Sequence, residues 1–293
     1  MELISAVIIT YKRPLNILAR AINSVLNQTY TEFELIIIND APEEIELANQ
    51  INEYIKNLDD YRIKYIEHKK NFGANKARNT GIEHAIGKYI AYLDDDDEWL
   101  PNKLETQINA FNEQNIGIVY SGFYIKDDIG NCIKKPVVIP KKNHLEALIE
   151  DNYIGSTSFP MLLTEAVRKV GAFDVNQKSC QEYELWIRIA KEYKVKAIND
   201  YLGVYYVSKD STFKGNYNSY MAGDISILNK HADLFNNYPV ECSNHLLRMY
   251  IYMLINKQFK KALYYKIHAF SVCWYNMNNL SLILFLKKFT KKI

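Results

Sequence analysis

Short apolar runs alternate with amphipathic segments through the first third of the chain. The apolar runs have the length of buried strands and lie at 6–9, 33–38, 62–66 and 88–93. The segments between them repeat apolar residues at helical spacing, and lie at 14–26, 43–58 and 73–86. This alternation predicts an α/β fold, in which a largely parallel sheet is flanked by helices.

The pattern changes after about residue 115. Apolar stretches at 118–125 and 133–139 predict a β-hairpin, and a helix at 181–193 and a strand at 204–207 are expected. From about residue 217 the periodicity is helical. We therefore predict one α/β domain at 1–215, with halves at 1–115 and 116–215, followed by a C-terminal helical extension at 216–293.

Polar side chains stand just past the ends of three predicted strands: Thr10, Asp40 and Asp94. Parallel sheets bind ligands beyond the carboxyl ends of their strands. Because these ends meet at one edge of the sheet, residues that are far apart in sequence should converge on one crevice. The spacing alone thus predicts a binding site there.

Four consecutive aspartates, Asp94 to Asp97, follow the fourth predicted strand. Neighbouring carboxylates repel one another by about 1 kcal/mol per pair even in water. A divalent cation would relieve this repulsion, and Mg²⁺ or Mn²⁺ is commonly held by one or two carboxylates together with substrate phosphates. A solvated acidic turn before a helix is the alternative.

Composition, net charge and cysteine spacing exclude several classes of protein. The 293 residues are 48% hydrophobic with a net charge of +2, which fits a globular fold and gives no field that would favour nucleic acid. The four cysteines are too widely spaced for a C-x-x-C metal pair or a dense disulfide framework, so we expect the reducing cytoplasm. We find neither a signal-peptide pattern nor the roughly 18-residue apolar run of a spanning helix.

Several motifs resemble those of family 2 glycosyltransferases, in order and at the family's spacing. They are VIITYKRP at 7–14, QTY at 28–30, ELIIIND at 34–40, NFGANKARNTG at 71–81 and GKYIAYLDDDD at 87–97. The resemblance covers 4 to about 104, and weaker motifs extend it to about 207. It implies a GT-A fold, a Rossmann-like mixed sheet flanked by helices, and an inverting sugar transfer from a nucleotide sugar.

The resemblance also implies a nucleotide pocket. In it, Asp40 would accept a hydrogen bond from a uracil-type base, and Thr10 and Tyr11 would line the same pocket. Arg13 belongs to the same motif and is assigned to nucleotide binding. Arg78 would sit near the base or the diphosphate, although a solvated helix charge is the alternative for this residue.

By the same analogy, Asp94 and Asp96 are the outer members of a D-x-D motif. Asp94 would lie near the ribose, and Asp96 would ligate the Mn²⁺ or Mg²⁺ ion that bridges the diphosphate. The additional aspartate, Asp95, leaves the register open by one position and is assigned to the nucleotide site. A metal there would stabilise the negative charge that grows on the leaving diphosphate.

The catalytic base is where the chain departs from the family pattern. Members commonly carry Glu-Asp before a Tyr-x-Leu-Trp helix, whereas the helix here begins with Gln181 and Glu182. Glu182 keeps a carboxylate but adds a methylene, and we predict that it is the general base. Asp174 or Glu184 could instead supply the base, or catalysis could be lost.

The expected activity is metal-dependent transfer of a hexosyl or N-acetylhexosaminyl group. The donor would be a UDP-sugar and the acceptor a hydroxyl of a glycan or lipid-linked molecule, in cell-envelope polysaccharide synthesis. A catalytically silent nucleotide-sugar-binding scaffold is the alternative. A nucleotidyltransferase is disfavoured, because no glycine-rich loop follows the first strand.

The last residues of the chain also predict a contact with a membrane or another surface. Residues 280–293 combine apolar residues with lysines, which suits peripheral contact with the inner face of the plasma membrane. Packing on the main domain or a homodimer contact are the alternatives. The acceptor side is expected after about residue 120, with 156–158 and 209–212 as candidates by position.

Overall fold

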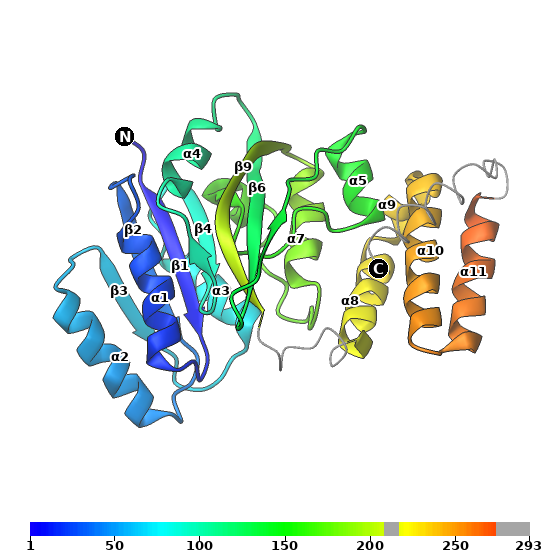
Figure 1. The fold of residues 1–293 in the computed structure, drawn as a ribbon. Coiled ribbons are helices and arrows are strands. Elements are labelled where there is room, and N and C mark those ends of the chain that lie inside the picture. Colours follow the sequence, from blue (N-terminus) through cyan, green and yellow to red (C-terminus); the bar gives the residue numbers. More distant parts are fainter. Residues whose placement is uncertain (208–216, 274–293) are drawn as a thin grey trace. The chain divides into compact units, whose positions relative to one another are not determined.

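The computed structural model describes residues 1–207 and 217–273 of the chain (Figure 1). These residues form two compact units. One contains 1–139, 154–207 and 217–220, and the other contains 140–153 and 221–273. The segment 140–153, which lies inside the predicted second half of the main domain, therefore groups with the C-terminal helices.

The first unit begins with the predicted alternation of strands and helices. Its parallel strands are ordered β3-β2-β1-β4, which are Ile63–Glu67, Phe33–Asn39, Ile4–Thr10 and Tyr89–Asp94. The helices between them are α1, Leu15–Leu26, α2, Ile45–Leu58, and α3, Ala74–His84. The expected strands and helices of this region are confirmed within a few residues.

Beyond β4 the sheet becomes mixed. It continues through β8, β6, β9 and β5, which are Met161–Leu163, Ile116–Asp127, Lys194–Val207 and Glu98–Trp99. β8 is antiparallel to both β4 and β6, whereas β9 runs parallel to β6. β7, Cys132–Lys135, completes the expected hairpin with β6. Helices α4, Lys103–Asn109, α6, Thr164–Lys169, and α7, Gln181–Ala190, flank this half.

The core of this unit forms where β1 and β2 are covered on both faces. The consecutive pairs Val7–Ile8 and Ile36–Ile37 are fully buried, which explains why these strands are apolar runs without alternation. Gly81 brings α3 directly onto β1, because a Cβ at this position would meet Val7 Cγ1 at 2.5 Å. This close approach sets where α3 presents its polar side chains.

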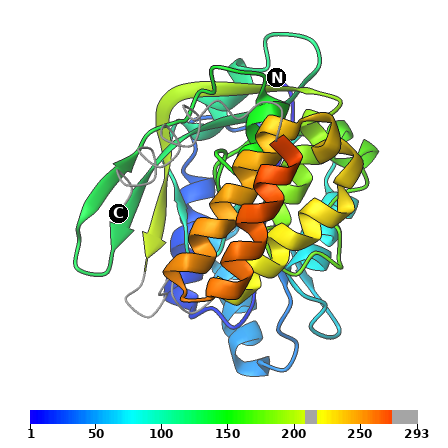
Figure 2. The same cartoon turned by 90° about the vertical axis from the view of Figure 1, so that its right-hand side faces the viewer.

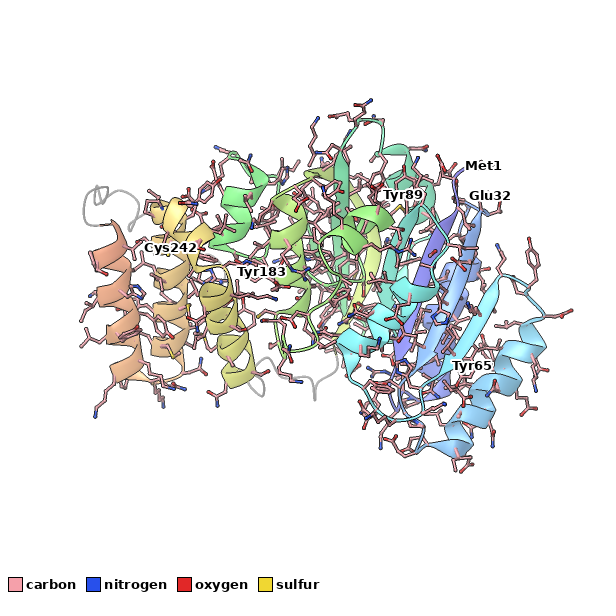
Figure 3. All side chains as sticks on the ribbon, turned by 180° about the vertical axis from the view of Figure 1, so that it is seen from behind. Met1, Glu32, Tyr65, Tyr89, Tyr183 and Cys242 are labelled. Atoms are coloured by element: carbon pink, nitrogen blue, oxygen red, sulfur yellow. The ribbon has the colours of Figure 1, made fainter. Side chains whose placement is uncertain are left out.

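The amino-terminal ends of the parallel strands lie along one edge of the sheet. Met1, Glu32 and Tyr89 mark this edge for β1, β2 and β4 (Figure 3). The carboxyl ends, with Thr10 and Asp94, therefore lie along the opposite edge.

The second unit is helical. It contains α5, His144–Glu150, most of α8, Tyr217–Lys230, and then α9, Ala232–Asn237, α10, Pro239–Ile255, and α11, Phe259–Cys273. α10 and α11 run side by side (Figure 2). Buried Arg248 of α10 binds Asp151 at 2.6 Å and Asp224 of α8 at 3.1 Å, so one guanidinium ties three segments together. None of the described helices is both long and apolar enough to cross a membrane.

Candidate active site

A cavity of about 490 Å³ opens at the carboxyl ends of the parallel strands. All of the residues predicted for the nucleotide and the metal line it, namely Thr10, Tyr11, Arg13, Asp40, Arg78, Asp94, Asp95 and Asp96. The predicted convergence of Thr10, Asp40 and Asp94 on one crevice is therefore confirmed. Within the described part of the chain, Glu182 is not among the lining residues.

The acidic run separates into inward and outward carboxylates. Asp95 and Asp97 are buried, whereas the side chains of Asp94 and Asp96 are 30% and 40% exposed and line the cavity. The two exposed carboxylates are the outer members of the D-x-D register predicted for the site. Within the acidic run, Asp94 and Asp96 therefore present the more exposed carboxylates to the cavity, while Asp95 lines it with a nearly buried side chain.

Asp95 is held by the turn that follows β1. Its carboxylate accepts hydrogen bonds from Thr10 Oγ1 and Arg13 Nε, both at 2.8 Å. The same guanidinium reaches Asp96 Oδ2 at 2.9 Å. Burial raises the pKa of Asp95 to about 6, while the charge of Arg13 and the Thr10 hydroxyl act in the opposite direction. Asp95 thus positions Thr10 and Arg13 in the wall of the cavity.

Asp97 points away from the cavity. It accepts hydrogen bonds from Ser158 Oγ at 2.6 Å and from the Tyr206 amide at 3.3 Å. Burial and the nearby charges of Asp94 and Asp96 raise its pKa well above the ordinary value, while the Ser158 hydroxyl opposes this shift. Its role here is structural, because it joins the end of β4 to β9 and to the segment before β8.

Hydroxyl groups from 156–158 also orient Asp94. Thr157 Oγ1 donates to Asp94 Oδ1 at 3.1 Å, and Ser156 Oγ donates to Oδ2 at 3.2 Å. We expected this segment on the acceptor side, and the structure brings it against the acidic run. The other acceptor candidate, 209–212, lies outside the described residues.

Asp40 is buried at the end of β2 and organises the loop before α3. Its carboxylate accepts from His68 Nδ1 at 2.7 Å and from the amides of Phe72 and Gly73 at 2.9 and 2.8 Å. Gly73 has a φ of 86°, a conformation that glycine adopts without strain. Since a carboxylate offers about four acceptor positions, the geometry leaves one on Oδ2 for a ligand.

Arg78 is buried rather than solvated, so the alternative of a solvated helix charge is wrong. Its guanidinium donates to Asp94 Oδ1 at 3.0 Å and to Gln181 Oε1 at 2.9 Å. It therefore connects α3, the end of β4 and the first residue of α7. Gly81, by allowing α3 to sit on β1, places Arg78 at this junction.

Glu182 is half-buried in the first turn of α7. Burial raises its pKa, the charge of Arg78 opposes that shift, and the charge of Asp94 adds to it. Of the alternative bases, Glu184 is fully buried and paired with Arg188 at 2.6 Å, and the Asp174 carboxylate accepts from the Asn176 amide at 2.9 Å. Burial and the ion pair with Arg188 give Glu184 a structural role.

The residues fit a metal that is held jointly with a substrate. In the described chain no group of three or more His, Cys, Asp or Glu side chains forms a metal cluster. Asp94 and Asp96 can each offer a carboxylate oxygen, so phosphates and water would have to complete an octahedral shell. Arg13 already occupies one oxygen of Asp96 and would have to share it.

Two further residues shape the site, and the sequence motifs did not single them out. Arg20 of α1 stacks on the Tyr206 ring at 3.6 Å and donates to the Asp96 carbonyl at 2.5 Å. Its helical position gives no indication of this contact. His68 follows β3 directly, so the strand-end rule that selected Asp40 would also have selected it.

Comparison with known proteins agrees with this geometry. The model of the family Glycosyl transferase family 2 matches residues 5–171, which is more than half of the chain. The chain therefore belongs to glycosyltransferase family 2, and it is an enzyme of the glycosyltransferase class.

The similar proteins differ in the share of their own length that the match covers. An uncharacterized glycosyltransferase of Methanocaldococcus jannaschii is 34% identical over 204 residues, covering 68% of this chain and 69% of the relative. The Escherichia coli UDP-Glc:alpha-D-GlcNAc-diphosphoundecaprenol beta-1,3-glucosyltransferase WfgD is 32% identical. The match covers 62% of this chain and 68% of WfgD. An uncharacterized glycosyltransferase of Rickettsia bellii is 33% identical, and the match spans 76% of this chain but only 31% of that protein.

Among solved structures, the chain resembles TarS of Staphylococcus aureus. The TM-score is 0.63 at 18% identity, with 92% of this chain and 81% of the other covered. TarS in complex with UDP-GlcNAc gives a TM-score of 0.61 at the same identity. The fold is therefore GT-A, and the predicted fold class, a mixed sheet flanked by helices with helices at the C-terminus, is confirmed.

Proposed function

We propose that this glycosyltransferase moves a hexosyl or N-acetylhexosaminyl group from a UDP-sugar to a hydroxyl of a glycan or lipid-linked acceptor, with inversion at the anomeric carbon. The observation that carries the proposal is the cavity in which Asp40, Arg78, Asp94 and Asp96 meet. Its volume of about 490 Å³ lies within the range of ligand sites, about 300–1,000 Å³.

The nucleotide is assigned to the cavity by its donors and acceptors. The remaining acceptor position on Asp40 suits an imide N–H of uracil, and Thr10 and Tyr11 stand beside it in the cavity wall. Arg13 and Arg78 line the same cavity and are paired with aspartates of the acidic run, so a diphosphate there would depend on a metal ion as well as on these guanidinium groups. Asp94 would accept from the ribose hydroxyls.

Asp96, with Asp94 beside it, would hold a Mn²⁺ or Mg²⁺ ion. Such an ion stabilises the charge that accumulates on the departing diphosphate. Arg13 would keep the Asp96 carboxylate oriented toward the cavity through its second hydrogen bond. Arg20, bound to the Asp96 carbonyl, restrains the same turn of backbone.

Glu182 would act as the general base. It would take the proton of the acceptor hydroxyl while that oxygen forms a bond to the anomeric carbon, and the bond from that carbon to the diphosphate breaks on the opposite face. A carboxylate with a raised pKa is a better proton acceptor than an ordinary glutamate. Arg78, which binds Gln181 beside it, would set the position of Glu182 relative to Asp94.

One relative supports the donor and acceptor classes. WfgD is named for a UDP-glucose donor and a diphosphoundecaprenol-linked acceptor. We assign this chain to cell-envelope polysaccharide synthesis, in the cytoplasm at the inner face of the plasma membrane. The expected membrane or homodimer contact of 280–293 falls on residues outside the described structure and stays a prediction.

A panel of nucleotide sugars tests the proposal. Thermal shifts should be largest with UDP-sugars plus Mn²⁺, and UDP release with a polyprenyl-diphosphate-sugar acceptor should follow for one of them. A preference for another nucleotide would contradict the Asp40 assignment. Donor binding without transfer to any acceptor, and without hydrolysis, would instead support a catalytically silent scaffold, to which the Gln181-Glu182 departure from the family pattern points.

A further inference from the structure

One face of α11 is apolar and exposed. Phe259, Leu263 and Ile267 are 65%, 57% and 60% exposed and stand four residues apart, so they share one side of the helix. On the other side, Ala269 is buried and its carbonyl accepts a hydrogen bond from Ser243 of α10. The helix is thus packed through one face and leaves an apolar stripe on the other.

The end of α10 adds two exposed apolar side chains that are close in sequence to α11. Leu254 and Ile255, at the end of α10, are also exposed, and only a short turn separates them from Phe259. Single exposed apolar side chains are common on protein surfaces, but a continuous stripe on one helix face marks an interaction site. We call these five residues, Leu254, Ile255, Phe259, Leu263 and Ile267, the apolar stripe.

The formal charges of the turn before α11 and of α11 itself are all basic. Exposed lysines stand in the turn and along α11, namely Lys257, Lys260, Lys261 and Lys266. The sequence contains no Asp or Glu after Glu241. Lys266 lies over the Tyr250 ring of α10 at 5.8 Å. The turn and α11 therefore combine exposed apolar side chains with exposed positive charge.

We propose that the apolar stripe and its lysines bind the surface of an anionic lipid bilayer. A helix with exposed apolar residues flanked by lysines lies along the interface, with the apolar side chains among the acyl chains and the ammonium groups at the phosphates. A second copy of the chain fits less well, since two such surfaces would bring like charges together. The segment 274–293 also carries lysines and no acidic residue, so it offers no complementary charge.

This proposal is independent of the donor, the acceptor and the predicted contact of 280–293. It concerns residues within the helical unit, and the tail stays intact in every variant of the main test. A failure of the lipid contact would therefore leave the proposed sugar transfer untouched.

Vesicle flotation of the full chain tests whether the apolar stripe and its lysines bind lipid. Vesicles of phosphatidylcholine mixed with phosphatidylglycerol should carry the protein, vesicles of phosphatidylcholine alone should carry much less, and added salt should release it. Ile267→Asp should abolish flotation. Ile129→Asp is the matched control, because Ile129 is 66% exposed in the β6–β7 turn of the other unit. Each substitution of Lys260 or Lys261 by Gln should weaken the affinity about fivefold.

Three results would overturn the proposal. Equal flotation of the wild type and Ile267→Asp, with both proteins folded by circular dichroism, would remove the stripe from the lipid contact. Binding that disappears only when 274–293 is deleted would assign the contact to the tail. A dimer in light scattering that Ile267→Asp converts to monomer, without vesicle binding, would assign the stripe to a second copy.

Discussion

Arg78 and Asp94 form an ion pair of 3.0 Å that joins the middle of α3 to the end of β4. The same guanidinium binds Gln181, the residue before Glu182, so the proposed base and the proposed ribose ligand share one support. Positioning of this kind matters in catalysis, because a displacement of about 1 Å can cost a large part of the rate. The first prediction follows from this relationship.

Glu182→Gln should lower the rate of sugar transfer by at least about 100-fold while donor affinity is retained, because the amide keeps the shape but cannot take a proton. The measurements are UDP release and isothermal titration with the UDP-sugar. In the wild type, the rate should fall on acidification at a higher pH than for an ordinary glutamate, since the pKa of Glu182 is raised.

Two variants serve as controls for this prediction. Glu192→Gln removes a surface partner of Lys169 and should transfer normally. Glu184→Gln should destabilise the fold through the loss of the Arg188 pair. Near-normal transfer by Glu182→Gln would place the base elsewhere.

Asp96→Asn should weaken the affinity for UDP at least about tenfold when Mn²⁺ is present, which corresponds to about 1.4 kcal/mol of binding free energy. Without metal, the affinity should change little. Calorimetric titration in both conditions measures the difference. Asp59→Asn is a suitable control, because Asp59 has a φ of 50° at the end of α2 and asparagine tolerates this conformation. Unchanged affinity with Mn²⁺ would remove Asp96 from the metal site.

Arg13→Gln should have two measurable effects. The free energy of unfolding should fall by about 1–3 kcal/mol, because buried Asp95 loses its charged donor. Affinity for Mn²⁺ alone should rise, since Asp96 is released from the guanidinium. Urea unfolding and Mn²⁺ titration followed by electron paramagnetic resonance measure these quantities.

A second substitution separates the causes of the Arg13 effect. Asp95→Asn in the Arg13→Gln background should recover part of the stability, because the uncompensated carboxylate is gone. Lys169→Gln, which breaks the pair of Lys169 with Glu192 at the surface, should cost less than about 1 kcal/mol. An equal loss for Arg13→Gln and Lys169→Gln would contradict the buried role of Asp95.

His245 makes the stability of the helical unit depend on pH. Burial, and then the charge of Arg248, hold the pKa of His245 well below its ordinary value of 6.5. The unfolded chain therefore binds a proton below about pH 6.5 that the folded chain does not, so its stability falls as the pH drops through 6.5. His245→Gln should flatten this part of the profile, which unfolding experiments at about pH 5.5 and about 7.5 measure. An unchanged slope would contradict the prediction.

Much of the site could be predicted from the sequence because its signals are local. Buried parallel strands are apolar runs, and the polar residues that follow them must meet at one edge of the sheet. This rule placed Thr10, Asp40 and Asp94 together and would have placed His68 with them. The family motifs added Arg78 and the outer members of the acidic run.

Other features depended on contacts between distant segments. The sequence could not show which aspartates of 94–97 face inward, because Thr10, Arg13 and Ser158 decide this from two other parts of the chain. Nor could it show that Arg20 reaches the Asp96 carbonyl, or that 140–153 groups with the C-terminal helices.

The sequence by itself therefore determined the order of the elements, the edge that carries the site and the residue types available there. The tertiary structure alone decided which of those charges are buried and paired and which are presented to a ligand. The physical reason is that burial and pairing of a carboxylate depend on donors brought together by packing, whereas strand and helix formation depend on the spacing of neighbouring residues.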